Sequence, residues 1–255
     1  MTSDRAIPRA RASTSARVPT GRHRWDTLPP VRTIRVAAFH AVAAAVALTG
    51  VALLFVVEHR GPGEFVYFTT QSNTLVGCCF LWAALAPWLP GRAAGGPPVV
   101  LRGAVTLYVL VTFLVFHLVL ANPASGFGDG SAHVGSVQNV LLHTVTPLLA
   151  LLDWALLVVV RPRWRWAVLW LSYPLAYLGF ALVRGLIVHR YPYPFLDVTS
   201  LGYGGVAIVA GVLFVVFWLL GLLVVGAGRL GTSRRARHVV DAPLARSVAG
   251  PGQRD

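Results

Sequence analysis

A short polar run interrupts an apolar part of the chain at residues 67–77, where the sequence reads YFTTQSNTLVG. An unpartnered polar group in hydrocarbon costs free energy, so these side chains should face other protein groups or a wet cavity rather than lipid. Thr69, Ser72 and Asn73 are spaced i, i+3 and i+4, which places them on one face of a helix. The hydroxyl of Thr69 on this face is a candidate nucleophile.

A second polar series occupies residues 136–146. Ser136, Asn139, His143 and Thr146 recur at intervals of 3, 4 and 3 residues, again on one helical face. The imidazole of His143 supplies what a threonine nucleophile needs. It accepts the hydroxyl proton during attack on an acyl carbon and returns it to the leaving group. Thr69 and His143 are therefore the predicted catalytic pair.

Other polar residues could bind the substrate or stabilise the oxyanion that acyl chemistry generates. Asn73, one turn beyond Thr69, and the guanidinium of Arg184 are the predicted oxyanion donors. An arginine within a span needs a partner, and the alternatives for Arg184 are Asp197, backbone carbonyls, an anionic ligand or the nearby interface. Asp197 could also reach down to orient His143. The full predicted set of substrate-binding or oxyanion residues is Ser72, Asn73, His117, Asn139, Arg184 and Asp197.

Two neighbouring hydroxyls remain alternatives to Thr69 as the nucleophile. Ser72 lies on the same predicted face. Thr70 is rotated by about 100° around the helix and fits that face poorly. Gln71 also points away from it, and we expect its side chain to hydrogen-bond a neighbouring helix.

Membrane-spanning helices are the elements that must position these residues. The 255-residue chain is 56% apolar and 12% charged, whereas soluble domains are about 25% charged. We therefore predict an all-α polytopic integral membrane protein with six transmembrane helices, because six apolar runs each approach the roughly 20 residues that cross a bilayer. The runs are 34–57, 65–89, 99–121, 136–160, 166–188 and 203–227. They form one domain, residues 34–227, between basic tails at 1–33 and 228–255 that we expect to be disordered.

The arginine distribution predicts the orientation of this domain. All 22 basic residues are arginine, a composition typical of GC-rich bacterial coding. Nineteen lie in the tails and in loops on the same side, while only Arg60 and Arg190 lie in loops on the other side. The positive-inside rule then places both termini in the cytoplasm and the protein in the plasma membrane. The net charge of +13 reflects this topology, so we expect no nucleic-acid partner.

Orientation also gives approximate depths for the polar residues. With a rise of about 1.5 Å per residue, Thr69, His117 and Arg184 lie roughly 6 Å from the outer edge of their spans, and His143 roughly 10 Å from it. Four spans thus bring polar groups into one layer of the outer leaflet. We predict a polar pocket that opens toward the extracytoplasmic side.

The remaining polar and sulfur-containing residues of the spans have structural interpretations. Asp153 lies in the inner half of its span, within reach of Arg161, and is expected to form a structural ion pair. Cys78 and Cys79 are adjacent in an apolar run, so they face different directions and do not form a disulfide or a metal site. No metal and no cofactor are expected.

Three segments resemble a known family: residues 67–77 quoted above, LLHTVTPLLALLDW at 141–154 and RYPYPFLDV at 190–198. Together with six spans they resemble the androgen-inducible protein family and its bacterial six-helix relatives, over about residues 35–225. Animal members of that family are intramembrane threonine hydrolases that cleave fatty acid esters of hydroxy fatty acids. The resemblance implies that Thr69 matches the family's threonine and His143 its histidine.

The chain also departs from the animal pattern. The residues that follow Thr69 are more polar, and the spacing from His143 to Pro147 is tighter. The resemblance therefore implies a lipid-like ester that enters sideways from the membrane, with membrane lipids as partners, but it does not define the substrate or the oligomeric state.

Three other functions remain alternatives. His117 and His143, on different spans at similar depth, could ligate a haem. Polar residues in spans also line solute pathways, although the chain has no inverted repeat and its inner half is largely apolar. In a non-catalytic scaffold, the same residues would only join helices, each interhelical hydrogen bond contributing about 1 kcal/mol or less.

Overall fold

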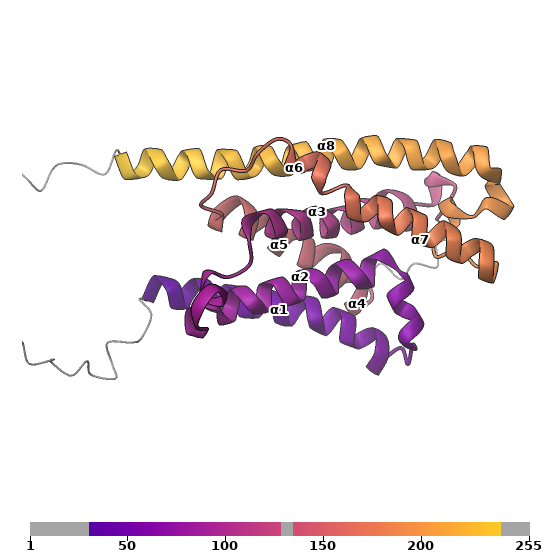
Figure 1. The fold of residues 1–255 in the computed structure, drawn as a ribbon. Coiled ribbons are helices and arrows are strands. Elements are labelled where there is room, and N and C mark those ends of the chain that lie inside the picture. The colour runs from indigo at the N-terminus through magenta and orange to yellow at the C-terminus, as the bar shows by residue number, and fades with distance from the viewer. Residues whose placement is uncertain (1–30, 129–134, 241–255) are drawn as a thin grey trace, which may run out of the picture.

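The computed structural model describes residues 31–128 and 135–240, and these residues fold into a bundle of helices (Figure 1). Within the described residues there is no β-strand. The helices are α1 (Val31–Val56), α2 (Phe68–Leu85), α3 (Val99–Val115), α4 (Val137–Val140), α5 (Thr146–Leu157), α6 (Trp166–Leu169), α7 (Ser172–Val188) and α8 (Val198–Val240). The all-α prediction is confirmed for this part of the chain.

Two π-helical segments extend or join these helices. Segment η5 (Phe116–Leu120) continues α3, and segment η7 (Leu141–Val145) joins α4 to α5. The six predicted runs therefore correspond to six rods: α1, α2, α3 with η5, α4 with η7 and α5, α6 with α7, and α8. Short 3₁₀ turns lie between them, including η2 (Pro62–Val66) before α2 and η8 (Pro194–Leu196) before α8.

Five of the rods are long and apolar enough to cross a membrane. They are Thr33–Val56, Val99–Leu120, Val137–Leu157, Trp166–Val188 and Val198–Ser233. The sixth, α2, has 18 residues, but the polar residues of its first two turns lower its hydropathy. The outer surface of the bundle is apolar as well, since only 17% of the most apolar stretch of α8 is buried within the protein. Such an exposed apolar helix is compatible with an integral membrane protein.

Helix α3 occupies the centre of the bundle, between α2, α5 and α8, and α1 packs along α2 (Figure 1). Leu107 and Val109 of α3 are completely buried. Gly103 allows the close approach near the N-terminal end of α3, because a Cβ there would lie 2.3 Å from the Trp170 ring. The start of α1 and the end of α8 lie at the same end of the bundle (Figure 1).

The C-terminal boundary and one ion pair differ from the sequence-based expectations. The last helix does not end at 227, because α8 continues to Val240 with one non-helical residue at Gly202.

The partners of Asp153 are Arg102 and His40 rather than Arg161. Arg102 donates from Nη2 to Oδ1 at 2.6 Å and from Nε to Oδ2 at 3.2 Å, and Nε2 of His40 lies 2.7 Å from Oδ1. Of the expected tails at 1–33 and 228–255, residues 1–30 and 241–255 lie outside the described residues.

Candidate active site

The predicted catalytic pair is brought together by α2 and η7. Thr69 is the second residue of α2, and His143 is the middle residue of η7. Oγ1 of Thr69 lies 3.3 Å from Nε2 of His143. This distance is long for a hydrogen bond, as catalytic hydrogen bonds often are before substrate binds.

The second ring nitrogen of His143 indicates its tautomer. Nδ1 lies 3.3 Å from the backbone oxygen of Asn139, and a carbonyl oxygen only accepts. We therefore assign the ring proton to Nδ1, which leaves the lone pair of Nε2 facing the hydroxyl of Thr69. The Phe116 ring stacks on the imidazole, with centroids 4.0 Å apart and planes at 15°. His143 is thus oriented as a base and held there on one ring face.

The π-helical turn that carries His143 is packed tightly against α1. A Cβ at Gly50 of α1 would lie 2.8 Å from Cδ2 of Leu142, so a larger residue there would force the Leu142 side chain to shift. π-helical turns are rare and are frequently found at functional sites. In this chain the turn brings His143 to the first turn of α2.

Asn73 joins the backbones that carry Thr69 and His143. Its Nδ2 donates to the carbonyl oxygens of Thr69, at 3.0 Å, and of Leu142, at 3.2 Å. The side chain is completely buried. The prediction that Asn73 lines the pocket as an oxyanion donor is wrong, because its amide protons face these two carbonyls. Asn73 is instead a positioning residue.

The other polar residues of α2 also form bonds within the protein. Ser72 is completely buried, and its hydroxyl donates to the carbonyl of Thr69 at 3.2 Å. Among the described residues, Thr69 is therefore the hydroxyl that faces His143, and Ser72 does not replace it. Gln71 accepts from the hydroxyl of Tyr173 on α7 at 2.5 Å, which confirms that its side chain bonds a neighbouring helix.

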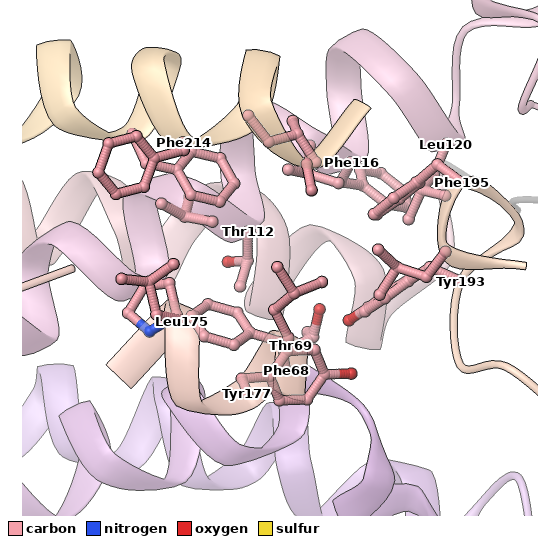
Figure 2. Close-up of a pocket in the computed structure, with 18 of the residues that line it drawn as sticks. Phe68, Thr69, Thr112, Phe116, Leu120, Leu175, Tyr177, Tyr193, Phe195 and Phe214 are labelled. Carbon is pink, nitrogen blue, oxygen red and sulfur yellow. The ribbon is translucent and has the colours of Figure 1, made fainter. Parts of the chain in front are cut away.

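An apolar pocket, shown in Figure 2, begins at the catalytic pair. About 780 Å³ of space, part of it open to the exterior, lies between α3, α7 and α8. Two of its lining side chains, Leu175 and Phe214, are 47% and 42% exposed, so the pocket reaches the apolar outer surface of the bundle. Its wall beyond Thr69 and His143 includes Val111, Leu175, Leu178, Leu213, Phe214 and Phe217.

A polar vestibule adjoins the same pair from the other side. It has about 870 Å³ of space, part of it open to the exterior, and lies at the end of the bundle where α1 ends and α2 begins. Thr69, His143 and Tyr193 line both spaces. The residues that give the vestibule its polar character are Glu58, Arg60, Glu64, Tyr67, Gln138 and Asn139.

Tyr193, which the sequence analysis did not assign to the site, projects into it from the loop between α7 and α8. Figure 2 shows its hydroxyl directed toward Thr69, with whose side chain it hydrogen-bonds. Burial raises the pKa of this phenol, although the bonds with Thr69 lower it in part, so the group stays protonated and can donate. The loop folds back closely because Gly185 leaves room for the Tyr191 ring, which a Cβ would approach to 2.0 Å.

Three of the predicted site residues do not line either space beside the catalytic pair, although His117 is close enough to His143 to interact with it electrostatically. Among the described residues, Arg184, Asp197 and His117 line neither the apolar pocket nor the vestibule. Arg184 donates to the carbonyl oxygen of Arg190 at 2.9 Å, so its partner is the backbone rather than a carboxylate or an oxyanion. Asp197 accepts from the backbone N–H of Thr199 at 2.8 Å and caps the start of α8, so it does not orient His143.

His117 and His143 are not arranged as haem ligands. Nε2 of His117 lies 3.1 Å from Oγ1 of Thr144, and both nitrogens of His143 face Thr69 and Asn139. Axial ligation would require these contacts to break. Among the described residues, no cluster of three or more His, Cys, Asp or Glu side chains could hold a metal ion.

Comparisons with models of protein families, with curated proteins and with solved structures found no match to this chain.

Proposed function

We propose that this chain is an intramembrane hydrolase of lipid-like esters, with Thr69 as the nucleophile and His143 as the general base. The observation that carries the proposal is where this pair lies. It is at the boundary between the apolar pocket and the polar vestibule, with Nδ1 of His143 directed to the carbonyl of Asn139. An ester at this boundary can be reached from lipid on one side and by water on the other.

The first half of the reaction acylates the enzyme. Oγ1 of Thr69 attacks the ester carbonyl carbon while its proton passes to Nε2 of His143. The carbonyl oxygen becomes an oxyanion, for which the hydroxyl of Tyr193 is the hydrogen-bond donor. Cleavage of the bond to the alcohol oxygen then releases the alcohol, which takes the proton from Nε2. An acyl ester of Thr69 remains.

The second half returns the enzyme to its starting state. Water from the vestibule attacks the acyl carbon while Nε2 of His143 takes one of its protons. The bond to Thr69 breaks, the carboxylic acid leaves, and Oγ1 recovers the proton. The carbonyl of Asn139 accepts from Nδ1 throughout and stabilises the imidazolium that forms in each half.

The family resemblance supports the same roles, since Thr69 and His143 match the threonine and histidine of the androgen-inducible protein family. Tyr193 lies in the third resembling segment. We extend the proposal to a six-span protein of a bacterial plasma membrane, with cytoplasmic termini and an extracytoplasmic vestibule, because the arginine distribution predicts that orientation.

Hydrolysis of a fluorogenic acyl ester by the purified protein in detergent tests the proposal. Thr69→Val keeps the shape of the side chain without its hydroxyl and should lower kcat by at least about 10³-fold, as should His143→Gln. Thr69→Ser should retain measurable activity. Matched activity in Thr69→Val and wild type would show that the ester cleavage does not use this site.

A further inference from the structure

The two spaces around the catalytic pair differ sharply in chemistry, and a substrate ester must extend into both. The apolar pocket is lined by aliphatic and aromatic side chains and reaches the outer surface between α7 and α8. The vestibule is lined by ionised, amide and hydroxyl side chains together with apolar ones such as Leu54 and Leu142, and it differs from the apolar pocket in its ionised groups. An ester bound at Thr69 consists of an acyl chain and an alcohol, and each of these can lie in only one of the two spaces.

Desolvation decides the orientation. An aliphatic chain in the vestibule would remove water from three ionised side chains, at a cost that hydrocarbon contacts do not offset. The same chain in the apolar pocket contacts only groups such as Leu178 and Leu213. The acyl chain therefore belongs in the apolar pocket, which it can reach from lipid, and the alcohol belongs in the vestibule.

The charges of the vestibule restrict the alcohol further. Arg60 is held between two carboxylates, with Nε 2.6 Å from Oε2 of Glu58 and Nη1 3.2 Å from Oε1 of Glu64. The arginine side chain is 49% exposed, whereas those of Glu58 and Glu64 are 22% and 15% exposed. Two carboxylates against one guanidinium leave a net negative charge, with the carboxylates set deeper than the cation.

The other groups that face the vestibule do not offset this charge. Tyr67, Gln138, Asn139 and Tyr193 are uncharged donors and acceptors suited to hydroxyl groups. His59, beside Glu58, is exposed, and its Nδ1 lies 3.0 Å from the carbonyl of Val57. A carboxylate or phosphate on the alcohol would thus meet like charge without a free cation among these residues.

We propose that the substrate is an ester of one aliphatic acyl chain with a compact polar alcohol that carries no anionic group, neutral or cationic, bound with its acyl chain in the apolar pocket and its alcohol in the vestibule. This inference rests on the proposed hydrolase function and specifies its substrate class.

The experiment compares three esters of one acyl chain that differ only in the alcohol: glycerol, choline and glycolate. Fatty acid release by the purified protein gives kcat/KM for each. The choline and glycerol esters should exceed the glycolate ester by about tenfold, the effect of one like charge near a partly hydrated site. The double substitution Glu58→Gln with Glu64→Gln should reduce this ratio. Asp197→Asn, which removes a carboxylate outside the vestibule, should leave the ratio unchanged.

The outcomes separate the inference from the function on which it rests. Hydrolysis that requires Thr69 but is equally fast or faster with the glycolate ester overturns the substrate class and leaves the hydrolase intact. A ratio that survives the double substitution also overturns it. Hydrolysis of none of the three esters, and of no fluorogenic ester, overturns both.

Discussion

Oγ1 of Thr69 and Nε2 of His143 lie 3.3 Å apart, although the two residues are 74 positions apart in the chain. Their backbones are joined at the same place, because the buried amide of Asn73 donates to the carbonyl of Thr69 and to that of Leu142, the residue before His143. The contact between hydroxyl and imidazole is therefore held by the main chain as well as by the side chains. This link has measurable consequences.

Asn73→Ala should lower kcat by about tenfold or more with little change in KM, because it loosens the geometry of the pair without touching either pocket. It also leaves two buried carbonyls without this donor, at a cost of about 1–3 kcal/mol in the free energy of unfolding. Thr74→Val is the matched control, since the Thr74 hydroxyl bonds the carbonyl of Thr70 within the same helix. A wild-type kcat in folded Asn73→Ala protein would exclude a positioning role.

Tyr193→Phe should lower kcat by about 10²–10³-fold, the usual effect of removing one oxyanion donor. Thermal stability should change little, because the ring and its stacking on Phe195, with centroids 5.1 Å apart, remain. Tyr191→Phe, two residues away in the same loop, should be nearly silent. If both variants turn over substrate like the wild type, another group must stabilise the oxyanion.

Asp153→Asn should destabilise the protein by roughly 3–5 kcal/mol, because it removes the buried counter-charge of the partly buried Arg102. The Asp153 side chain is 4% exposed and binds Arg102 through both oxygens. Thermal unfolding in detergent measures the loss. The folded fraction should keep its activity, because Asp153 lies outside both pockets. A stability equal to that of the wild type would refute the structural role of this ion-pair cluster.

The cap of α8 should weaken in acid. Hydrogen bonds from the Thr199 side chain lower the pKa of Asp197 below its ordinary value of 3.8. A folded pKa below the unfolded value means that the stabilisation is fully present above the unfolded pKa and is lost as pH falls through the folded one. Unfolding midpoints measured from pH 6 to pH 3 should therefore drop more in wild type than in Asp197→Asn. Parallel pH profiles would show that the carboxylate contributes nothing.

Much of the fold could be predicted from the sequence, because bilayer thickness fixes the length of an apolar run. Those runs correspond to the six rods, and the spacing of Thr69 and Asn73 correctly placed both on one face. The sequence analysis ends the last helix at 227, short of the arginine-rich continuation of α8 to Val240, because such a sequence is as typical of an irregular tail as of an extended helix. Hydropathy alone does not distinguish an irregular tail from an extended helix.

The details of the site depend on contacts that no local pattern encodes. Nothing in the sequence marks the extra residue of the π-helical turn that redirects His143. Tyr193 lies near a span end, where tyrosine is also a common interface residue, so its role could not be recognised. The partner of Arg184 could not be chosen from the sequence, because the chain turns at His189, with φ of 52°, and brings the carbonyl of Arg190 to it. This hydrogen bond gives the Arg184 guanidinium a backbone partner outside the pocket.

The most direct test of the central claim is to locate the residue that reacts with a fluorophosphonate in native membranes, by mass spectrometry of the adduct. Wild type is compared with Thr69→Ala, His143→Ala and Ser72→Ala at matched expression. We predict an adduct on Thr69 in the wild type and in Ser72→Ala, and none in Thr69→Ala or His143→Ala. An adduct on Ser72, labelling that survives Thr69→Ala, or no labelling of the folded wild type would contradict the assignment of Thr69 as an activated nucleophile.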